Sequence, residues 1–413
     1  MRRTCKRNPL LILCALMCVL VVANFCDLVV RYQINSTDNS MNVSDIGDLE
    51  SEQLAQTGRR HRNLEQIHRE NLHGSNVQQN DDLMWIQEMS DVYERAPLMN
   101  PDKDEFVKQN NTSDECNDFH SSFKENLQKV LNYSFNVPEK YLKLLNLDRV
   151  GIKSITSKSV DSPYPILASA SSSNHYNEIQ GLIRDYHQNL LPLYPNMKLI
   201  LYDLGLNKNQ LKQMKKYCKC EVRQFPFHSF PNHIRNLSGF GWKPLIIQLL
   251  LVEFDFVMWV DASVRFDGNP LNKLIEGAKE VGVQIIPGWG SIAVRTNPQT
   301  FAALGEQMCM FDYPELEATW MAFKRSEFTL TAVMKPWVSC ALQYGCMDFD
   351  KSKSYLRCPR GKKQRLGSCH RFDQSVIGII LTRLFNHKSH LCQFIVNGIG
   401  SMKRGEYVKY FPK

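Results

Sequence analysis

The sequence predicts an α/β fold in which helices cover both faces of a mostly parallel sheet. From about residue 164 onward, short apolar segments of strand length alternate with longer segments whose apolar residues recur at helical spacing. This alternation is typical of βαβ units, which build parallel sheets with helices on either side. Residues 256–260 are all apolar and are followed by Asp261, as in a buried strand that ends at a ligand-binding edge. We expect this fold in residues 161–413, after a membrane anchor and a stem.

The order of the elements follows from the same patterns and from local start signals. Asn207 is a preferred N-cap and precedes a helical segment. Pro244 falls in the first turn of a predicted helix, where proline is tolerated. The predicted strands are residues 165–170, 197–203, 220–225 and 256–261, and the predicted helices are residues 176–190, 207–217 and 242–254.

Composition excludes several classes of protein. The chain has 413 residues, of which 43% are hydrophobic and 22% are charged, which excludes collagen-like, coiled-coil, wholly disordered and multispan membrane proteins. The formal net charge of +8 is modest, and no basic motif for nucleic acid accompanies it. We therefore expect no nucleic-acid partner.

The N-terminus predicts the compartment. Residues 1–8 carry four basic side chains, no charge occurs from there to Cys26, and Asp27 follows. We interpret residues 9–30 as a signal-anchor and residues 1–8 as a cytoplasmic tail, because positive charge before the span favours this orientation. A cleaved signal peptide is the alternative, although residues 23–26 match a cleavage site poorly. Both place the rest of the chain in the secretory lumen. We expect a single-pass type II protein of the Golgi membrane, with the ER or the cell surface as alternatives.

Residues 31–115 are predicted to form a lumenal stem. They are rich in polar and charged residues with little apolar periodicity, so we expect partial disorder, with some helix between Glu65 and Tyr93. Apolar residues return at helical spacing in residues 116–160, a predicted helical lead-in to the main domain. Five of the six N-glycosylation sequons precede residue 140; they begin at Asn35, Asn42, Asn110, Asn111, Asn132 and Asn236.

Nine cysteines follow the N-terminal apolar segment. In an oxidising lumen most should pair, and the odd number leaves one that is free or forms a disulfide-linked dimer. Cys218 and Cys220 are too close in sequence for an easy mutual bridge. No paired C-x-x-C occurs, so zinc is not expected.

Asp261 and Ser263 form the sharpest chemical pattern. Alternation along an extended chain places both side chains on the same side at the carboxyl edge of the sheet. A carboxylate and a hydroxyl there could hold Mg²⁺ or Mn²⁺ against a diphosphate, and Arg265 could face the same phosphates. The alternative is that Asp261 only ends the strand or caps the next element.

The order of several short motifs resembles a GT-A glycosyltransferase. Residues 242–244 (Trp-Lys-Pro), an apolar helix and then residues 259–263 (Trp-Val-Asp-Ala-Ser) resemble the centre of that fold. The resemblance is greatest to the metazoan DUF1647 family, similar in layout to glycogenin-like enzymes. Supporting segments are residues 174–178, 202–206 and 373–375, and the resemblance covers residues 160–400. The family motif is Asp-x-Asp; with Ser263 in its last position, a mode that uses basic residues instead of a metal stays open.

The resemblance implies a nucleotide-sugar donor, a glycan or glycoprotein acceptor, and a set of site residues. Asp373 and Gln374 are the implied catalytic pair, and Asp261, Ser263 and His390 are the implied ligands of a divalent cation. The donor is expected to contact Asn174, His175, Tyr176, Asp203, Lys243, Arg265 and Trp289. The alternative for His175 and His390 is a surface histidine without a role in the site, and the alternative for Asp203 is a structural turn residue.

Asp373 is the candidate for the reacting centre. In an inverting transfer it would deprotonate the acceptor hydroxyl, and in a retaining enzyme it would position the reactants with Gln374. The alternative is an acidic residue that stabilises a helix N-terminus. Residues 287–291 are expected to form a tight turn between strands, with Trp289 either stacked on a sugar or in the core. Residues 351–371 are strongly basic and form either a grip on an anionic ligand or a solvated loop.

Two functions of different classes remain from the sequence. The first is a membrane-anchored lumenal glycosyltransferase that transfers a sugar from a nucleotide sugar to a hydroxyl. The second is a catalytically inactive protein that keeps the fold and binds carbohydrate; Ser263 is the feature that favours it.

Overall fold

The computed structural model describes residues 84–97, 116, 119, 122–158, 162–350, 358 and 365–412. The predicted tail, anchor and most of the stem lie outside these residues, as do the sequons at Asn35, Asn42, Asn110 and Asn111 and most of the basic segment 351–371. Within the described residues, none of the helices combines the length and the apolar character that a membrane crossing needs.

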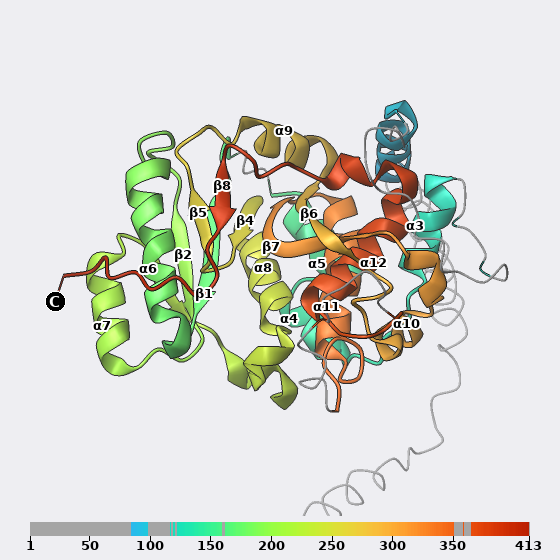
Figure 1. Cartoon of the computed structure of the whole chain (residues 1–413). Coiled ribbons are helices and arrows are strands. Elements are labelled where there is room, and N and C mark those ends of the chain that lie inside the picture. The colour runs from blue at the N-terminus through green and yellow to red at the C-terminus, as the bar shows by residue number, and fades with distance from the viewer. Residues whose placement is uncertain are drawn as a thin grey trace, which may run out of the picture. The chain divides into compact units, whose positions relative to one another are not determined.

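A six-stranded sheet forms the centre of the described unit, in the order β3-β2-β1-β4-β7-β6 (Figure 1). Its strands are β1 (Ile166–Ser171), β2 (Leu199–Asp203), β3 (Glu221–Gln224), β4 (Phe256–Val260), β6 (Val283–Ser291) and β7 (Pro314–Lys324). The first four are mutually parallel, β7 is antiparallel to β4, and β6 is antiparallel to β7. The predicted α/β fold with a mostly parallel sheet is confirmed.

Helices cover both faces of this sheet. The helices are α3 (Phe123–Leu131), α4 (Glu139–Leu144), α5 (Arg149–Thr156), α6 (Tyr176–Asp185), α7 (Lys208–Tyr217), α8 (Trp242–Glu253), α9 (Asn272–Val281), α10 (Pro298–Leu304), α11 (Lys335–Leu342) and α12 (Asp373–Phe385). Alternate residues of β4 belong to different hydrophobic clusters: Trp259 packs in the cluster that contains α8, α11 and α12, and Met258 packs in the cluster that contains α6. Because successive side chains of a strand point to opposite faces, a strand buried on both faces must be apolar throughout, as β4 is.

The predicted strands and helices are present with small shifts of their ends. Asn207 caps α7 in a capping box with Gln210, as its position indicated. The predicted helix 176–190 is α6 followed by one turn of π-helix, residues 186–190.

The predicted tight turn at residues 287–291 is wrong, because these residues continue β6 with irregular register against β7. The glycines serve close packing within the strand: a Cβ at Gly288 would lie 2.5 Å from the Glu315 side chain. Trp289 between them is 97% exposed, so it is not a core residue.

Part of the predicted stem packs onto the main domain. Residues 84–95 form a helix whose Met89 and Tyr93 are buried in the core. Lys388 Nζ donates to the backbone oxygen of Tyr93 at 2.8 Å. Helices α3, α4 and α5 lie in the predicted lead-in, and α3 packs against α12.

Four disulfides join eight of the nine cysteines: Cys116–Cys309, Cys218–Cys220, Cys340–Cys346 and Cys358–Cys369. The expectation that Cys218 and Cys220 do not pair is wrong. Lys219 between them has φ +47°, a left-handed conformation in which the Cα atoms lie 5.1 Å apart, within disulfide range. Cys392 is free and buried, and its thiol donates to the Ser389 carbonyl, so it gives no support to a disulfide-linked dimer.

Candidate active site

A cleft of about 430 Å³ lies where the strand order reverses. The chain passes from β1 outward to β2 and β3 and then returns to β4 on the other side of β1. The loops after β1 and β4 therefore leave in opposite directions, and such a crevice at the carboxyl ends of the strands is the usual ligand site of open α/β sheets. Ser172 and His175 line it after β1, and Asp261, Ala262 and Ser263 line it after β4.

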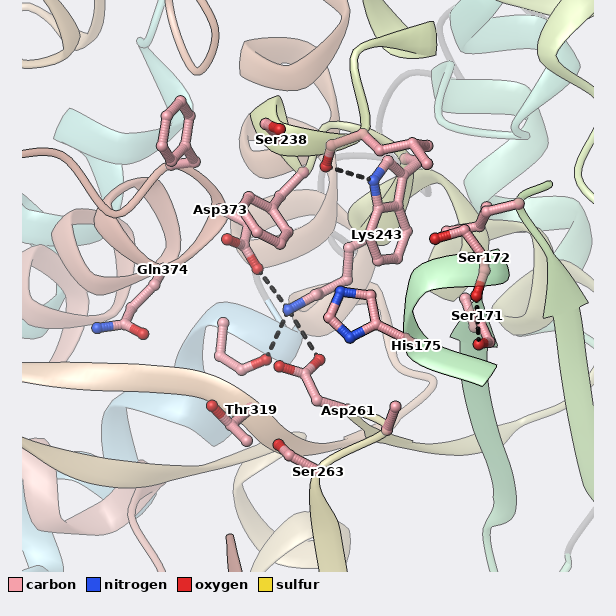
Figure 2. A pocket seen from close by; sticks show the side chains of 18 of the residues that line it. Ser171, Ser172, His175, Ser238, Lys243, Asp261, Ser263, Thr319, Asp373 and Gln374 are labelled. Atoms are coloured by element: carbon pink, nitrogen blue, oxygen red, sulfur yellow. Dashed lines mark hydrogen bonds and ion pairs between the residues drawn. The ribbon is translucent and has the colours of Figure 1, made fainter. Parts of the chain in front are cut away.

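A buried lysine joins two carboxylates in the floor of this cleft (Figure 2). Lys243 Nζ lies 2.7 Å from Asp373 Oδ2 and 3.1 Å from Asp261 Oδ1. It also donates to the backbone oxygen of Ala318 in β7 at 3.0 Å. Residues from α8, the end of β4, the start of α12 and β7 thus meet at one ammonium group.

Each of the three side chains is positioned by its element. Lys243 stands in the first turn of α8, where all the surrounding residues are buried. Trp259 Nε1 donates to Asp261 Oδ1 at 2.9 Å and so fixes the rotamer of the carboxylate that follows β4. Asp373 is the first residue of α12, and Trp337 Nε1 holds its backbone oxygen at 3.0 Å.

The charges of this group depend on one another. Burial alone would lower the pKa of Lys243, but the carboxylates of Asp261 and Asp373 outweigh it and leave this pKa raised. Burial raises the pKa of Asp373, and the lysine opposes that shift. The ammonium therefore stays charged at neutral pH.

Gln374 also lines the cleft, beside Asp373. Its side-chain nitrogen donates to Glu315 Oε2 at 2.7 Å, and Arg295 forms an ion pair with the other oxygen of Glu315. The two predicted catalytic residues are therefore brought to the cleft together, and each is held by a buried charged partner.

Of the predicted donor residues, Asn174, His175 and Lys243 line the cleft. The hydrogen bond from His175 Nδ1 to Glu178 Oε2, at 2.7 Å, raises the pKa of His175. Tyr176, the first residue of α6, does not line it; its side chain is buried and its hydroxyl donates to Gln213.

Four other predicted site residues lie outside the wall of the cleft. Asp203 accepts from the backbone nitrogens of residues 205 and 206 in a local turn. Arg265 is buried and pairs with Glu406 at 2.7 Å. Trp289 and His390 do not line the cleft either. Of these four, Arg265 reaches the back of the cleft wall, because its Nη1 donates to the backbone oxygen of Ala262 at 2.8 Å and Ala262 lines the cleft.

The residues present do not fit a divalent cation. Of the predicted ligands, Asp261 and Ser263 line the cleft, but Asp261 Oδ1 is already held by Lys243 and by Trp259. Mg²⁺ and Mn²⁺ require several oxygen ligands, and the second carboxylate, Asp373, also points to the lysine. Among the residues that the structure describes, no group of three His, Cys, Asp or Glu side chains is placed to hold a metal.

Sequence reasoning missed Arg404, which lines the cleft with Gly405. The short strand β8 (Gly400–Met402) pairs with β5 (Val264–Phe266), directly after the Asp-Ala-Ser motif, and so carries the C-terminal segment across the site. Arg404 Nη2 lies 3.2 Å from Thr319 Oγ1 and 3.4 Å from Glu317 Oε2. A three-residue strand leaves no periodic signal, so the sequence could not place this arginine.

A family model now identifies part of the chain. Residues 106–248 match the family described as "Protein of unknown function (DUF1647)". The resemblance inferred from the motifs is confirmed, although the matched segment begins earlier and ends earlier than residues 160–400. It includes Lys243 and ends within α8, before Asp261, Asp373 and Arg404.

Solved structures that are similar to this chain include glycosyltransferases. The WbbM bifunctional glycosyltransferase has 9% identity and a TM-score of 0.33, over 55% of this chain and 38% of its own. Core-mannan synthase A from Aspergillus fumigatus, in a Mn/GDP form, has 10% identity and a TM-score of 0.33, over 59% and 76%. Mouse xyloside xylosyltransferase 1 has 10% identity and a TM-score of 0.32, over 56% and 84%. Likeness at this level does not establish a shared activity. No curated protein matches the chain significantly in sequence.

Proposed function

We propose that this chain is a glycosyltransferase that transfers a sugar from a nucleotide sugar to a hydroxyl of a glycan or glycoprotein. The observation that carries the proposal is the cleft between the carboxyl ends of β1 and β4, with Asp261, Lys243 and Asp373 in its floor. A crevice at this point of an α/β sheet is where such folds bind nucleotides.

The lining of the cleft supports an anionic donor. His175, Arg371 and Arg404 bring basic side chains to its wall, and Ser171, Ser172 and Asn174 bring hydroxyl and amide groups. Arginine matches the geometry of phosphate oxygens with paired donors. We therefore assign the diphosphate of the donor to this basic wall and the sugar to the floor beside Asp373.

The proposed reaction forms one bond, breaks one bond and moves one proton. The acceptor oxygen forms a bond to the anomeric carbon, and the bond from that carbon to the diphosphate breaks. The nucleoside diphosphate leaves with the electron pair, and Asp373 receives the proton of the acceptor hydroxyl. The raised pKa of Asp373 makes it a stronger base than an exposed aspartate.

The compartment belongs to the same proposal. We propose a type II, single-pass protein of the Golgi membrane with the domain in the lumen. The four disulfides support an oxidising compartment, because cytosolic proteins rarely keep such bridges.

A panel of nucleotide sugars tests the activity. The purified full chain is incubated with each donor, and released nucleoside diphosphate is measured with and without glycan acceptors. Asp373→Asn should lower turnover at least about a hundredfold, the usual contribution of a positioned base. Asp267→Asn is the matched control, because Asp267 is an exposed acid that follows β5 and does not line the cleft. Retained turnover in Asp373→Asn removes Asp373 from the reaction, and no release from any donor contradicts the proposed activity.

Carbohydrate binding without transfer is the second candidate. The observation that favours it is that Lys243 already forms ion pairs with both Asp261 and Asp373. Calorimetry distinguishes the two: binding of glycans without any binding of nucleoside diphosphates supports the second candidate and contradicts the first.

A further inference from the structure

The ammonium of Lys243 is bound like a coordinated cation. A lysine ammonium has three N–H donors and no acceptor. Three oxygens surround it, from Asp373 at 2.7 Å, Ala318 at 3.0 Å and Asp261 at 3.1 Å. The contacts with the two aspartates are ion pairs and the contact with Ala318 is a hydrogen bond, and the three oxygens come from the start of α12, from β7 and from the residue that follows β4.

Burial makes the two ion pairs of Lys243 costly to break. The side chain of Lys243 is 4% exposed and that of Asp373 is 6% exposed, whereas Asp261 is 32% exposed toward the cleft. A buried charge is tolerated when it is paired and fully hydrogen-bonded, and removal of one partner leaves the others uncompensated. The lysine therefore cannot withdraw from the two carboxylates without a large cost.

A divalent cation at this place would have to share the two carboxylates with the ammonium. Asp261 and Asp373 are the carboxylates that converge at the carboxyl edge of β4, and the ammonium lies between them. A second cation at this place would meet the positive charge of Lys243 at short range. Ser263 adds one hydroxyl to the wall but no charge.

We propose that the cleft binds its diphosphate-bearing ligand without a divalent metal, because Lys243 is a built-in cation at the place where a metal would bind. Arg404 supplies positive charge at the rim, toward the diphosphate. The identity of the ligand rests on the proposed function, whereas the exclusion of a metal by Lys243 does not depend on it.

Arg404 is anchored for this role by the segment around it. The Gly405 backbone nitrogen donates to Glu178 Oε1 at 2.6 Å, and Glu406 pairs with the buried Arg265. The Arg404 side chain itself is 55% exposed, and in the described part of the chain only its Nη2 bonds to protein oxygens. The remaining N–H groups of the guanidinium are available to an anion.

Titration of the full chain with Mn²⁺ tests the built-in cation directly. Electron paramagnetic resonance measures free Mn²⁺ in the presence of wild-type protein, Lys243→Ala and Asp261→Asn. We expect wild type to bind no Mn²⁺ at Asp261 up to about 1 mM, a range that covers functional protein sites for hard divalent cations. Lys243→Ala frees two carboxylates and should bind Mn²⁺ at least about tenfold more tightly than wild type.

Two results overturn the proposal. One is Mn²⁺ binding by wild type that Asp261→Asn removes, and the other is a folded Lys243→Ala protein, checked by thermal melting, that gains no Mn²⁺ binding. If Lys243→Ala does not fold, the comparison of wild type with Asp261→Asn still decides whether Asp261 holds a metal.

Calorimetry with UDP and GDP tests the basic rim. We expect each nucleotide that binds to have the same Kd in EDTA and in Mn²⁺, within about twofold. Arg404→Ala should weaken the binding of that nucleotide about tenfold in EDTA, because one hydrogen bond to a charged group is lost. Lys403→Ala is the matched control, since the neighbouring Lys403 does not line the cleft. A tenfold gain in affinity from Mn²⁺, or no effect of Arg404→Ala, overturns the proposal. Absence of binding by both nucleotides contradicts the proposed function instead.

Discussion

His370 lines the cleft as a neutral imidazole. Its Nε2 donates to the Met347 carbonyl at 3.0 Å, and its Nδ1 accepts from the backbone nitrogen of Asn297 at 3.3 Å. Complete burial lowers the pKa of His370 to about 4. The side chain therefore joins the start of α12 to the N-cap of α10 without carrying charge, and protonation would break the bond to Asn297.

The first prediction concerns pH. In the unfolded chain His370 binds a proton near pH 6.5, but in the folded chain only near pH 4. Its contribution to stability is therefore complete above pH 6.5 and is lost as the pH falls from 6.5 to 4, by roughly 3 kcal/mol in total. Urea unfolding at a series of pH values should show a smaller loss in His370→Gln, which keeps a terminal N–H donor. Equal pH slopes for the two proteins would exclude His370 as the cause.

The second prediction concerns the two sequons within the described residues. Asn132 is exposed, whereas Asn236 is partly buried and donates to Asp348 Oδ2 at 2.7 Å. A glycan requires a solvent-accessible side-chain amide. Mass spectrometry of protein produced through the secretory pathway should find a glycan at Asn132 and none at Asn236. Glycosylation of Asn236 would show that its bond to Asp348 does not form in the mature protein.

At the scale of elements, the sequence predicted those strands and helices whose position depends on the local pattern of apolar residues. The strand 256–260 and the helix after Trp242 were predictable because continuous apolar residues mark elements buried on all sides. The path of residues 287–291 was not predictable, because glycines in this pattern are compatible with a tight turn and also with a strand that packs closely against Glu315. The ion pair of Lys243 with Asp373 joins residues that are far apart in sequence, and no local signal reports such a pair.

The third prediction compares two arginine–glutamate pairs between elements. Arg383 of α12 pairs with Glu306 after α10, both almost fully buried, and Tyr133 donates to the same carboxylate. Arg383→Met should destabilise the fold by about 3–5 kcal/mol, because it leaves a buried carboxylate uncompensated. The control is Arg223→Met, whose partner Glu253 is about half exposed, with an expected cost of about 1 kcal/mol or less. Equal costs in urea unfolding would contradict this difference.

At the scale of the whole molecule, one disulfide ties the segment before α3 to the segment after α10. Cys116 and Cys309 are separated by 193 residues, whereas Cys340 and Cys346 are separated by 6. Cross-links that close longer loops restrict the unfolded chain more. The N-terminal helices are therefore expected to depend on this bridge for their place on α12.

The fourth prediction follows from these loop lengths. Replacing Cys116 and Cys309 by alanine should cost about 5 kcal/mol, and replacing Cys340 and Cys346 should cost about 2 kcal/mol, from loop entropy. Cys340 and Cys346 are more buried than Cys116 and Cys309, so the loss of packing alone would make their replacement the more costly of the two. The predicted order therefore tests loop entropy against packing. A larger loss for the short loop in urea unfolding would contradict the entropic account.

The central claim is that the cleft between β1 and β4 is a metal-independent nucleotide-sugar site. A crystal structure of the full chain, grown with UDP or GDP and Mn²⁺, tests it most directly. We predict the diphosphate in the cleft beside Arg404, Lys243 still between Asp261 and Asp373, and no anomalous manganese signal at Asp261. Manganese bound by Asp261, or a nucleotide bound elsewhere on the molecule, would contradict the claim.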